Sequence, residues 1–169
     1  MSKARPPFGR LERILARLDF SWSVTGNHLT YIEEHGLWAE RFRPGGPHGL
    51  WIAGHLAFYE RGSLKLYQGL EKNSLGDWGS FFGNGCPCSD DLGLYPAPET
   101  VRGELTSGRK AIRESIAAFT DADLDRPVTN ERLAIRDWQS QIEFMIWHES
   151  HHAAQLGAIA NSHRDSVAA

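Results

Sequence analysis

Apolar side chains recur at intervals of three or four residues along four stretches of the chain, which is the spacing of an amphipathic helix. The pattern predicts four helices, over about residues 7–34, 48–70, 98–119 and 135–161. Gly36 supplies a stop signal for the first helix, and Gly26 inside it is a candidate position for a kink. Four helices of this length predict an all-α fold, an up-and-down four-helix bundle.

Two connections between these helices differ in composition. Residues 73–96, between helices two and three, are rich in Gly and aromatic residues and include a Cys-Pro-Cys sequence. A connection this long in a compact fold is usually functional or mobile. Residues 120–132 are acidic and polar, which predicts an ordinary surface loop. Because the chain shows no internal repeat and no linker, we expect one domain over residues 1–169.

The composition supports a helical fold and limits the classes of partner that the protein is expected to bind. The chain has 17 Ala and 17 Leu but four Val, a balance that favours helices over strands. Its 2 Cys are too few for a disulfide framework, and it has neither a long apolar run nor a signal-peptide pattern. We therefore expect a cytoplasmic location without a membrane segment. The net charge is −3, with basic and acidic residues interleaved, which argues against a nucleic-acid partner.

Residues 147–156, with the sequence WHESHHAAQL, carry the strongest chemical signal in the chain. His148 and His152 are four residues apart, so on a helix their side chains lie one above the other on the same face. That face is also the apolar stripe of the fourth predicted helix, and a shared metal ion would satisfy two inward-facing imidazoles. His55, alone on the apolar stripe of the second helix, is the candidate third ligand. These residues predict a three-histidine metal site with positions left open for water.

Structural roles compete with metal binding for each histidine. A lone histidine on an apolar stripe, as His55 is, is more often a hydrogen-bonded core residue than a ligand. His151 lies about 100° from His148 in helical projection, which predicts contact with a neighbouring helix or a partner chain. His48 is a candidate either for the pocket mouth or for the start of the second helix. The other three, His28, His35 and His163, are expected on the surface.

Residues 148–152 also match the H-E-x-x-H motif of zinc metalloproteases, in which Glu149 would be the general base. The context argues against a protease, because Gln and Ala stand where the extended motif has its Gly and third His. Glu149 also follows His148 directly, which predicts that its side chain points away from the metal-binding face.

Other side chains are candidates for the surroundings of this site. Cys86 and Cys88 could ligate a metal or react with substrate if their loop folds over the bundle end near the histidines. Two incidental loop cysteines are the simpler interpretation. Gln155 and Glu60 are candidates to orient the imidazoles. Tyr59 is a candidate to supply a hydroxyl to the pocket, and core packing explains it equally well.

Three segments carry a family resemblance: G-H-L-A-F-Y-E around His55, A-F-T-D-A-D-L-D-R-P-V over residues 118–128, and H-E-S-H-H-A-A-Q-L from His148 onward. Together they resemble the DinB/YfiT-like superfamily of metal-dependent four-helix bundles. The resemblance covers nearly the whole chain in helix order. It implies that His55, His148 and His152 bind a divalent metal, commonly zinc or nickel, with Gln155 close by, and that the protein is a homodimer.

Characterised relatives in that superfamily include maleylpyruvate isomerases and transferases of low-molecular-weight thiols. The resemblance therefore implies a metal-dependent enzyme, a thiol transferase or hydrolase, that activates water or a low-molecular-weight thiol toward a small-molecule substrate. The alternative is a non-catalytic dimeric bundle, serving in stress response or small-molecule binding, whose metal is structural or absent. Ala154 stands where the family often has Gly, and the Cys-Pro-Cys loop is not part of the common pattern. The resemblance therefore does not identify the substrate of this protein.

Overall fold

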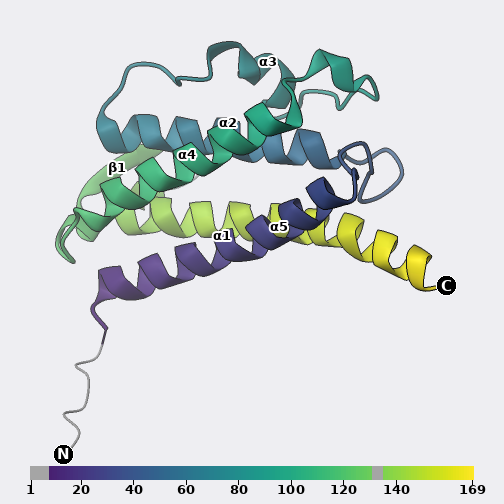
Figure 1. Ribbon diagram of the computed structural model, residues 1–169. Helices are drawn as coiled ribbons and strands as arrows, with labels where there is room; N and C mark the ends of the chain where they lie inside the picture. The colour runs from purple at the N-terminus through teal and green to yellow at the C-terminus, as the bar shows by residue number, and fades with distance from the viewer. Residues whose placement is uncertain (1–7, 131–134) are drawn as a thin grey trace, which may run out of the picture.

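The computed structural model describes residues 8–130 and 135–169, and within them the fold is mostly helical, as predicted. Four long helices form the body of this part of the chain (Figure 1): α1 (Arg10–Glu34), α2 (Gly49–Gln68), α4 (Pro98–Ala117) and α5 (Trp138–Ala168). The shorter elements are η1 (Gly76–Trp78), α3 (Gly79–Phe82), η2 (Leu92–Leu94), η3 (Asp123–Asp125), β1 (Pro127–Asn130) and β2 (Ile135–Asp137). No helix among the described residues is long and apolar enough to span a membrane.

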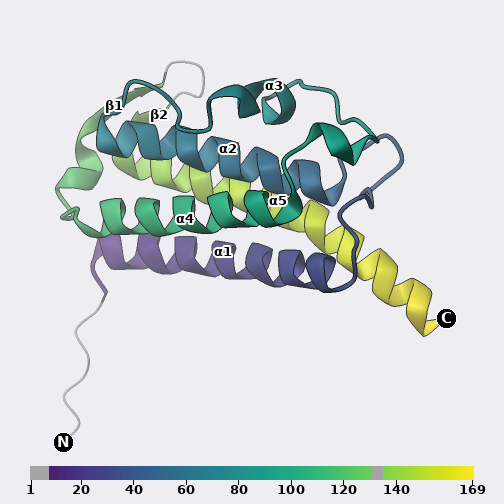
Figure 2. The same cartoon turned by 45° about the horizontal axis from the view of Figure 1, so that its top comes forward.

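The directions of the helices differ from the up-and-down order that the sequence predicts. One hydrophobic cluster joins the end of α1 to the starts of α2 and α4 and the end of α5, through Ile32, Ile52, Val101 and Ile159. A second cluster joins the opposite ends of the same four helices. Helices α1 and α5 therefore run one way and α2 and α4 the other, as Figure 2 shows. The order is up, down, down, up.

The long connection between α2 and α4 follows from this arrangement. Because α2 and α4 are parallel, the chain must return along the length of α2, and a helix of 20 residues is about 30 Å long. Gly69, with φ of 63°, ends α2, and the return segment crosses the outside of the bundle carrying η1 and α3 (Figure 1). The sequence identified this connection as unusual but did not indicate that it reverses the helix order.

A short antiparallel β-ribbon replaces part of the predicted surface loop before α5. Strands β1 and β2 pair with each other, and Ile135, which the sequence assigned to the helix, lies in β2. The helix begins after Asp137, whose Oδ1 accepts a hydrogen bond from the Ser140 amide at 2.7 Å, as an N-cap does. The predicted loop residues 131 and 132 lie outside the described residues.

The remaining helix boundaries also shift, and the shifts have local causes. Helix α1 continues without interruption through Gly26, so no break marks that position. Its predicted start at residue 7 lies outside the described residues, and the helix begins at Arg10, after the N-cap Gly9. Helix α5 extends beyond the predicted end at residue 161 to Ala168, because no Gly or Pro follows Gly157 to stop it.

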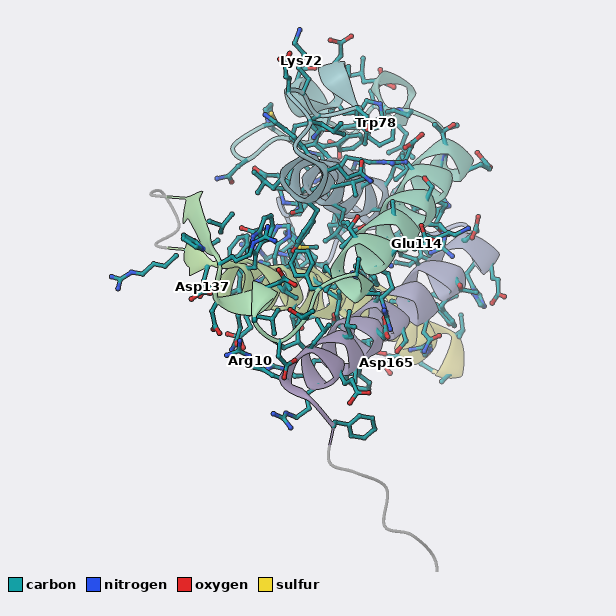
Figure 3. The ribbon with its side chains drawn as sticks, turned by 90° about the vertical axis from the view of Figure 1, so that its left-hand side faces the viewer. Arg10, Lys72, Trp78, Glu114, Asp137 and Asp165 are labelled. Carbon is teal, nitrogen blue, oxygen red and sulfur yellow. The ribbon has the colours of Figure 1, made fainter. Side chains whose placement is uncertain are left out.

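Asp121 connects the start of α1 to the segment that precedes α5. Its carboxylate accepts hydrogen bonds from the backbone amides of Arg10 (3.1 Å) and Leu11 (2.8 Å). The Arg10 guanidinium also pairs with Asp125 at 2.7 Å. Figure 3 views the molecule from this end, where Arg10 and Asp137 are labelled. These contacts satisfy amides at the helix N-terminus that have no partner within the helix.

Candidate metal centre

The three predicted ligands converge although they come from two helices. His55 lies on α2, and His148 and His152 lie one turn apart on α5. One ring nitrogen of each imidazole lies within 4.8 Å of the corresponding atoms of the other two. Nε2 of His55 lies 3.1 Å from Nε2 of His148. The structure thus places three imidazoles around one point between the helices.

The orientation of His55 is set by the long connection. Nδ1 of His55 donates to the backbone carbonyl of Phe82, the last residue of α3, at 2.7 Å. With its proton on Nδ1, the ring presents the Nε2 lone pair to the other histidines. Phe82 is fully buried against Gly54, where a Cβ would overlap the Phe82 ring. A glycine immediately before His55 is therefore what allows α3 to approach closely enough to hold it.

Gln155 orients the second imidazole, as the sequence predicts. Nδ1 of His152 donates to Oε1 of Gln155 at 2.7 Å, so that Nε2 of His152 also presents a lone pair to the cluster. The Gln155 amide nitrogen in turn donates to Nε2 of His151 at 3.3 Å. His151 is exposed and stacks on Trp147, so the expected contact with a neighbouring helix of this chain is wrong.

Burial keeps the three imidazoles neutral. Together with the neighbouring imidazoles, which contribute less, it lowers the pKa of His148 to about 4 and that of His152 to about 3. Burial is also the main cause that lowers the pKa of His55. Neutral imidazole is the form that ligates metal ions.

Aromatic rings enclose the cluster. Trp51 stacks on His55 with ring centroids 4.8 Å apart, and its indole N–H donates to the Phe81 carbonyl. The Tyr59 ring lies 4.5 Å from that of His55, whereas its hydroxyl accepts a hydrogen bond from the backbone amide of Asn84. The ring of Tyr59 therefore lines the site, and its hydroxyl binds the long connection between α2 and α4 through Asn84. His148 is only half-buried, which leaves the cluster accessible from its side.

The two cysteines are not part of the cluster. Cys86 donates its thiol proton to the Gly79 carbonyl, with Sγ 3.4 Å from the oxygen, and Cys88 packs against the first hydrophobic cluster. Among residues 8–130 and 135–169, the group of potential ligands at this point contains the three histidines and no thiol. The connection does fold over the site, as hypothesised, but it contributes a backbone carbonyl to the histidines.

Two other histidines have positions that the sequence left open or misplaced. Nδ1 of His48 accepts from the Trp51 amide at 3.0 Å and its Nε2 donates to the Ser89 carbonyl at 3.1 Å, which makes it the N-cap of α2. It therefore belongs to the helix start and not to the pocket mouth. His28, expected on the surface, is half-buried against Gly157 on α5.

A buried ion cluster beside the histidines was not predicted. Arg109 on α4 pairs with Glu60 on α2 at 3.0 Å and with Glu149 on α5 at 2.5 Å. Burial raises the pKa of Glu60 to about 8, against the attraction of Arg109 and with a contribution from Glu149. The three groups therefore retain a proton at neutral pH, which balances their charge.

The signal for this cluster was present in the heptad spacing of α5. Glu149 lies seven residues from both Ile142 and Leu156, on the same buried face. As predicted, its carboxylate points away from the histidines, but it enters the core and binds Arg109. Glu60 pairs with Arg109 and makes no direct hydrogen bond to the imidazoles within the described parts of the chain.

Comparison with known proteins agrees with the geometry. The family model of the DinB superfamily matches residues 17–156, a range that includes His55, His148, His152 and Gln155. No curated protein matches the chain significantly. Because the match extends from the first half of α1 into the second half of α5, the chain belongs to the DinB superfamily.

Proposed function

We propose that His55, His148 and His152 bind one divalent metal ion, zinc or nickel, in a centre that activates water or a low-molecular-weight thiol. The observation that carries the proposal is the orientation of the imidazoles. The Phe82 carbonyl and the Gln155 amide hold two of the three rings with their lone pairs turned inward. Three neutral nitrogen donors within 4.8 Å of one another suit zinc and nickel, both of which favour imidazole.

The metal would supply Lewis acidity and lower the pKa of a water or thiol that it coordinates. The protein's own contribution is orientation and access. Three ligands leave coordination positions open, and the half-buried side of His148 is the route by which a small molecule would approach. The rings of Trp51 and Tyr59 would exclude bulk water and pack against an apolar substrate group. On this basis the protein is a metal-dependent thiol transferase or hydrolase.

The competing function is a non-catalytic bundle with a structural metal. The two hydrophobic clusters pack without any contribution from the three ring nitrogens, which supports a fold that persists without metal. A structural metal predicts the opposite, since its removal should unfold the protein or lower its Tm strongly. Circular dichroism melting with and without a chelator separates the two functions.

The proposed partner is a second copy of the chain. A groove of about 580 Å³ runs between α1 and α5, and its lining includes the small residues Ala16, Ser21, Ser150, Ala153 and Ala154. Phe20, also in the lining, is 70 % exposed. A two-fold interface places the same patch on both subunits, so a projecting ring next to a receiving groove is self-complementary.

Metal analysis of purified protein tests the central proposal. Wild type, His55→Ala and His148→Ala are compared, with His35→Ala as the control because His35 is exposed and outside the cluster. We expect about one divalent ion per chain in wild type and control, and loss of the ion in both cluster variants. Wild type that binds neither zinc nor nickel when these are added would overturn the proposal. Thiol-transfer and ester or amide hydrolysis assays of loaded wild type then test catalysis, with His55→Ala as the inactive reference.

A further inference from the structure

The third imidazole lacks the kind of anchor that the other two have. His55 and His152 each donate Nδ1–H to a fixed oxygen, whereas Nδ1 of His148 has no hydrogen-bond partner within residues 8–130 and 135–169. Nε2 of His148 lies 3.1 Å from Nε2 of His55, which has only a lone pair to offer. That contact is a hydrogen bond when His148 carries its proton on Nε2. To ligate a metal through Nε2, His148 must carry the proton on Nδ1 instead, and that proton needs an acceptor.

A small recess adjoins His148 on the side of the ion cluster. It has a volume of about 20 Å³ and lies between α2 and α5. Its lining consists of Trp22, Tyr59, Glu60, Ser63, Phe144, Met145, His148 and Glu149. The space is about that of one water molecule, and the side chains of Glu60, Ser63 and Glu149 make part of its wall polar.

Glu60, which lines this recess, has one carboxylate oxygen without a hydrogen-bond partner among the described residues. Its side chain is 7 % exposed, and Oε1 accepts from Arg109 at 3.0 Å. The other oxygen, Oε2, is buried and has no hydrogen-bond partner among the described residues. A buried polar atom without a partner costs about 1–3 kcal/mol, so such atoms usually bind protein groups or ordered water.

We propose that Glu60 is a positioning residue for His148 and acts through one water molecule bound in the recess. The water accepts one hydrogen bond from Nδ1–H of His148 and a second from the carboxyl proton on Oε2 of Glu60. The third imidazole is then anchored through Nδ1, as the Phe82 carbonyl and Gln155 anchor the other two. All three Nε2 lone pairs point to the shared position, and Arg109 holds Glu60 in place. This inference rests on the proposed metal site and adds to it an outer-sphere residue on α2.

Two variants remove the water by independent means. Glu60→Leu removes the carboxyl at similar volume, and Ser63→Val fills the recess while leaving the Glu60–Arg109 pair intact. Ser63→Ala, which leaves the recess open, is the control for Ser63→Val. Glu104→Leu is the control for Glu60→Leu, because Glu104 pairs with Arg61 at 2.6 Å away from the recess.

The first measurement is the affinity for zinc and for nickel, by competition with a chromophoric chelator. Loss of an outer-sphere partner of a metal ligand typically weakens binding about 10- to 100-fold. We expect that loss for Glu60→Leu and Ser63→Val, and wild-type affinity for both controls. If Glu60→Leu does not fold, Ser63→Val still decides the question. Wild-type affinity in Ser63→Val would overturn the inference.

The second measurement reports the proton itself. Long-range ¹H–¹⁵N spectra of the imidazoles distinguish the two neutral tautomers of His148. In wild type we expect Nε2–H in the chelator-treated protein and Nδ1–H after zinc is added. In Ser63→Val the Nδ1–H signal of the zinc form should be broadened by exchange with solvent, and an unchanged signal would contradict the bound water. Wild type that binds no metal overturns the proposed function as well, whereas normal metal binding with unaffected variants overturns only the role of Glu60.

Discussion

Two polar clusters lie next to each other between the described helices, and they balance their buried groups differently. The Glu60–Arg109–Glu149 cluster contains its own cation, in ion pairs of 3.0 and 2.5 Å. The histidine cluster consists of neutral donors whose anchors, the Phe82 carbonyl and the Gln155 amide, turn lone pairs toward one another. Lone pairs that face one another are stabilised by a cation placed between them. One cluster therefore holds its own cation, and the other is prepared for an added ion.

This difference shows how adjacent residues on one helix can serve opposite purposes. His148 and Glu149 are neighbours in sequence, but the turn of the helix directs one toward His55 and the other toward Arg109. Arg109 pairs with both carboxyl groups and thus keeps them from competing with the imidazoles for a metal. Changes to either cluster should consequently have separable effects on stability and on metal binding.

The largest expected effect comes from removing the internal cation. Arg109→Met leaves two buried carboxyl groups without their partner, which should lower the free energy of unfolding by about 3–5 kcal/mol. Arg113→Met is the control, because Arg113 pairs with Asp19 at the surface of the same bundle, where such pairs contribute about 0–1 kcal/mol. Urea unfolding of both variants measures the difference. A loss in Arg109→Met no larger than in the control would show that the cluster needs no cation.

The pH dependence of stability tests the proton in the same cluster. Burial raises the pKa of Glu60 to about 8 from 4.5, so between these values the folded protein keeps a proton that the unfolded chain releases. The free energy of unfolding therefore falls as the pH rises, by up to about 1.4 kcal/mol per pH unit. Relative to Glu60→Gln, metal-free wild type should lose about 2 kcal/mol between pH 6 and pH 8. Urea unfolding at each pH measures the free energy. If it changes with pH in the same way in both proteins, the result would contradict a protonated Glu60.

Gly54→Ala tests the anchor of His55 indirectly, through the position of Phe82. The added Cβ would overlap the Phe82 ring, so α3 must shift, and overpacking of this kind costs about 1–3 kcal/mol. The shift should also move the Phe82 carbonyl from His55 and weaken zinc binding. Gly26→Ala is the matched control, since a Cβ there meets nothing within 4 Å and should stabilise α1 by about 0.5–1 kcal/mol. Thermal melts and zinc titrations measure both effects, and normal zinc affinity in Gly54→Ala would argue against the anchor.

The smallest expected effect on the monomer's stability comes from Phe20→Glu. Phe20 is 70 % exposed, so its replacement should change the stability of a single chain by less than about 0.5 kcal/mol. If a second copy covers the groove, a buried glutamate would separate the subunits while metal content stays the same. Light scattering during size-exclusion chromatography gives the mass, with Leu66→Glu as a control at an exposed position on α2. A wild-type protein that elutes as a monomer would exclude this interface.

Local pattern predicted what depends on helix geometry alone. Four long helices and the shared face of His148 and His152 follow from a period of 3.6 residues, and Gln155 lies one turn beyond on the same helix. The predicted start of α5 was wrong by three residues, although Asp137 before Trp138 is an N-cap signal that could have corrected it. The ion cluster was missed because Glu60 was considered as a partner of the imidazoles and Glu149 as a protease base, and neither was related to the apolar face on which it lies.

The sequence by itself determined the helical class, the family and the three histidines that meet in the core. These properties reside in spacing within a helix, which the backbone fixes over a few residues. Only the tertiary structure decided the directions of α2 and α4, the carbonyl that orients His55 from 27 residues away, and the arginine that pairs with two glutamates. A long connection is compatible with either direction of the next helix. The partners of a buried group therefore depend on how the helices dock against one another, which local spacing does not specify.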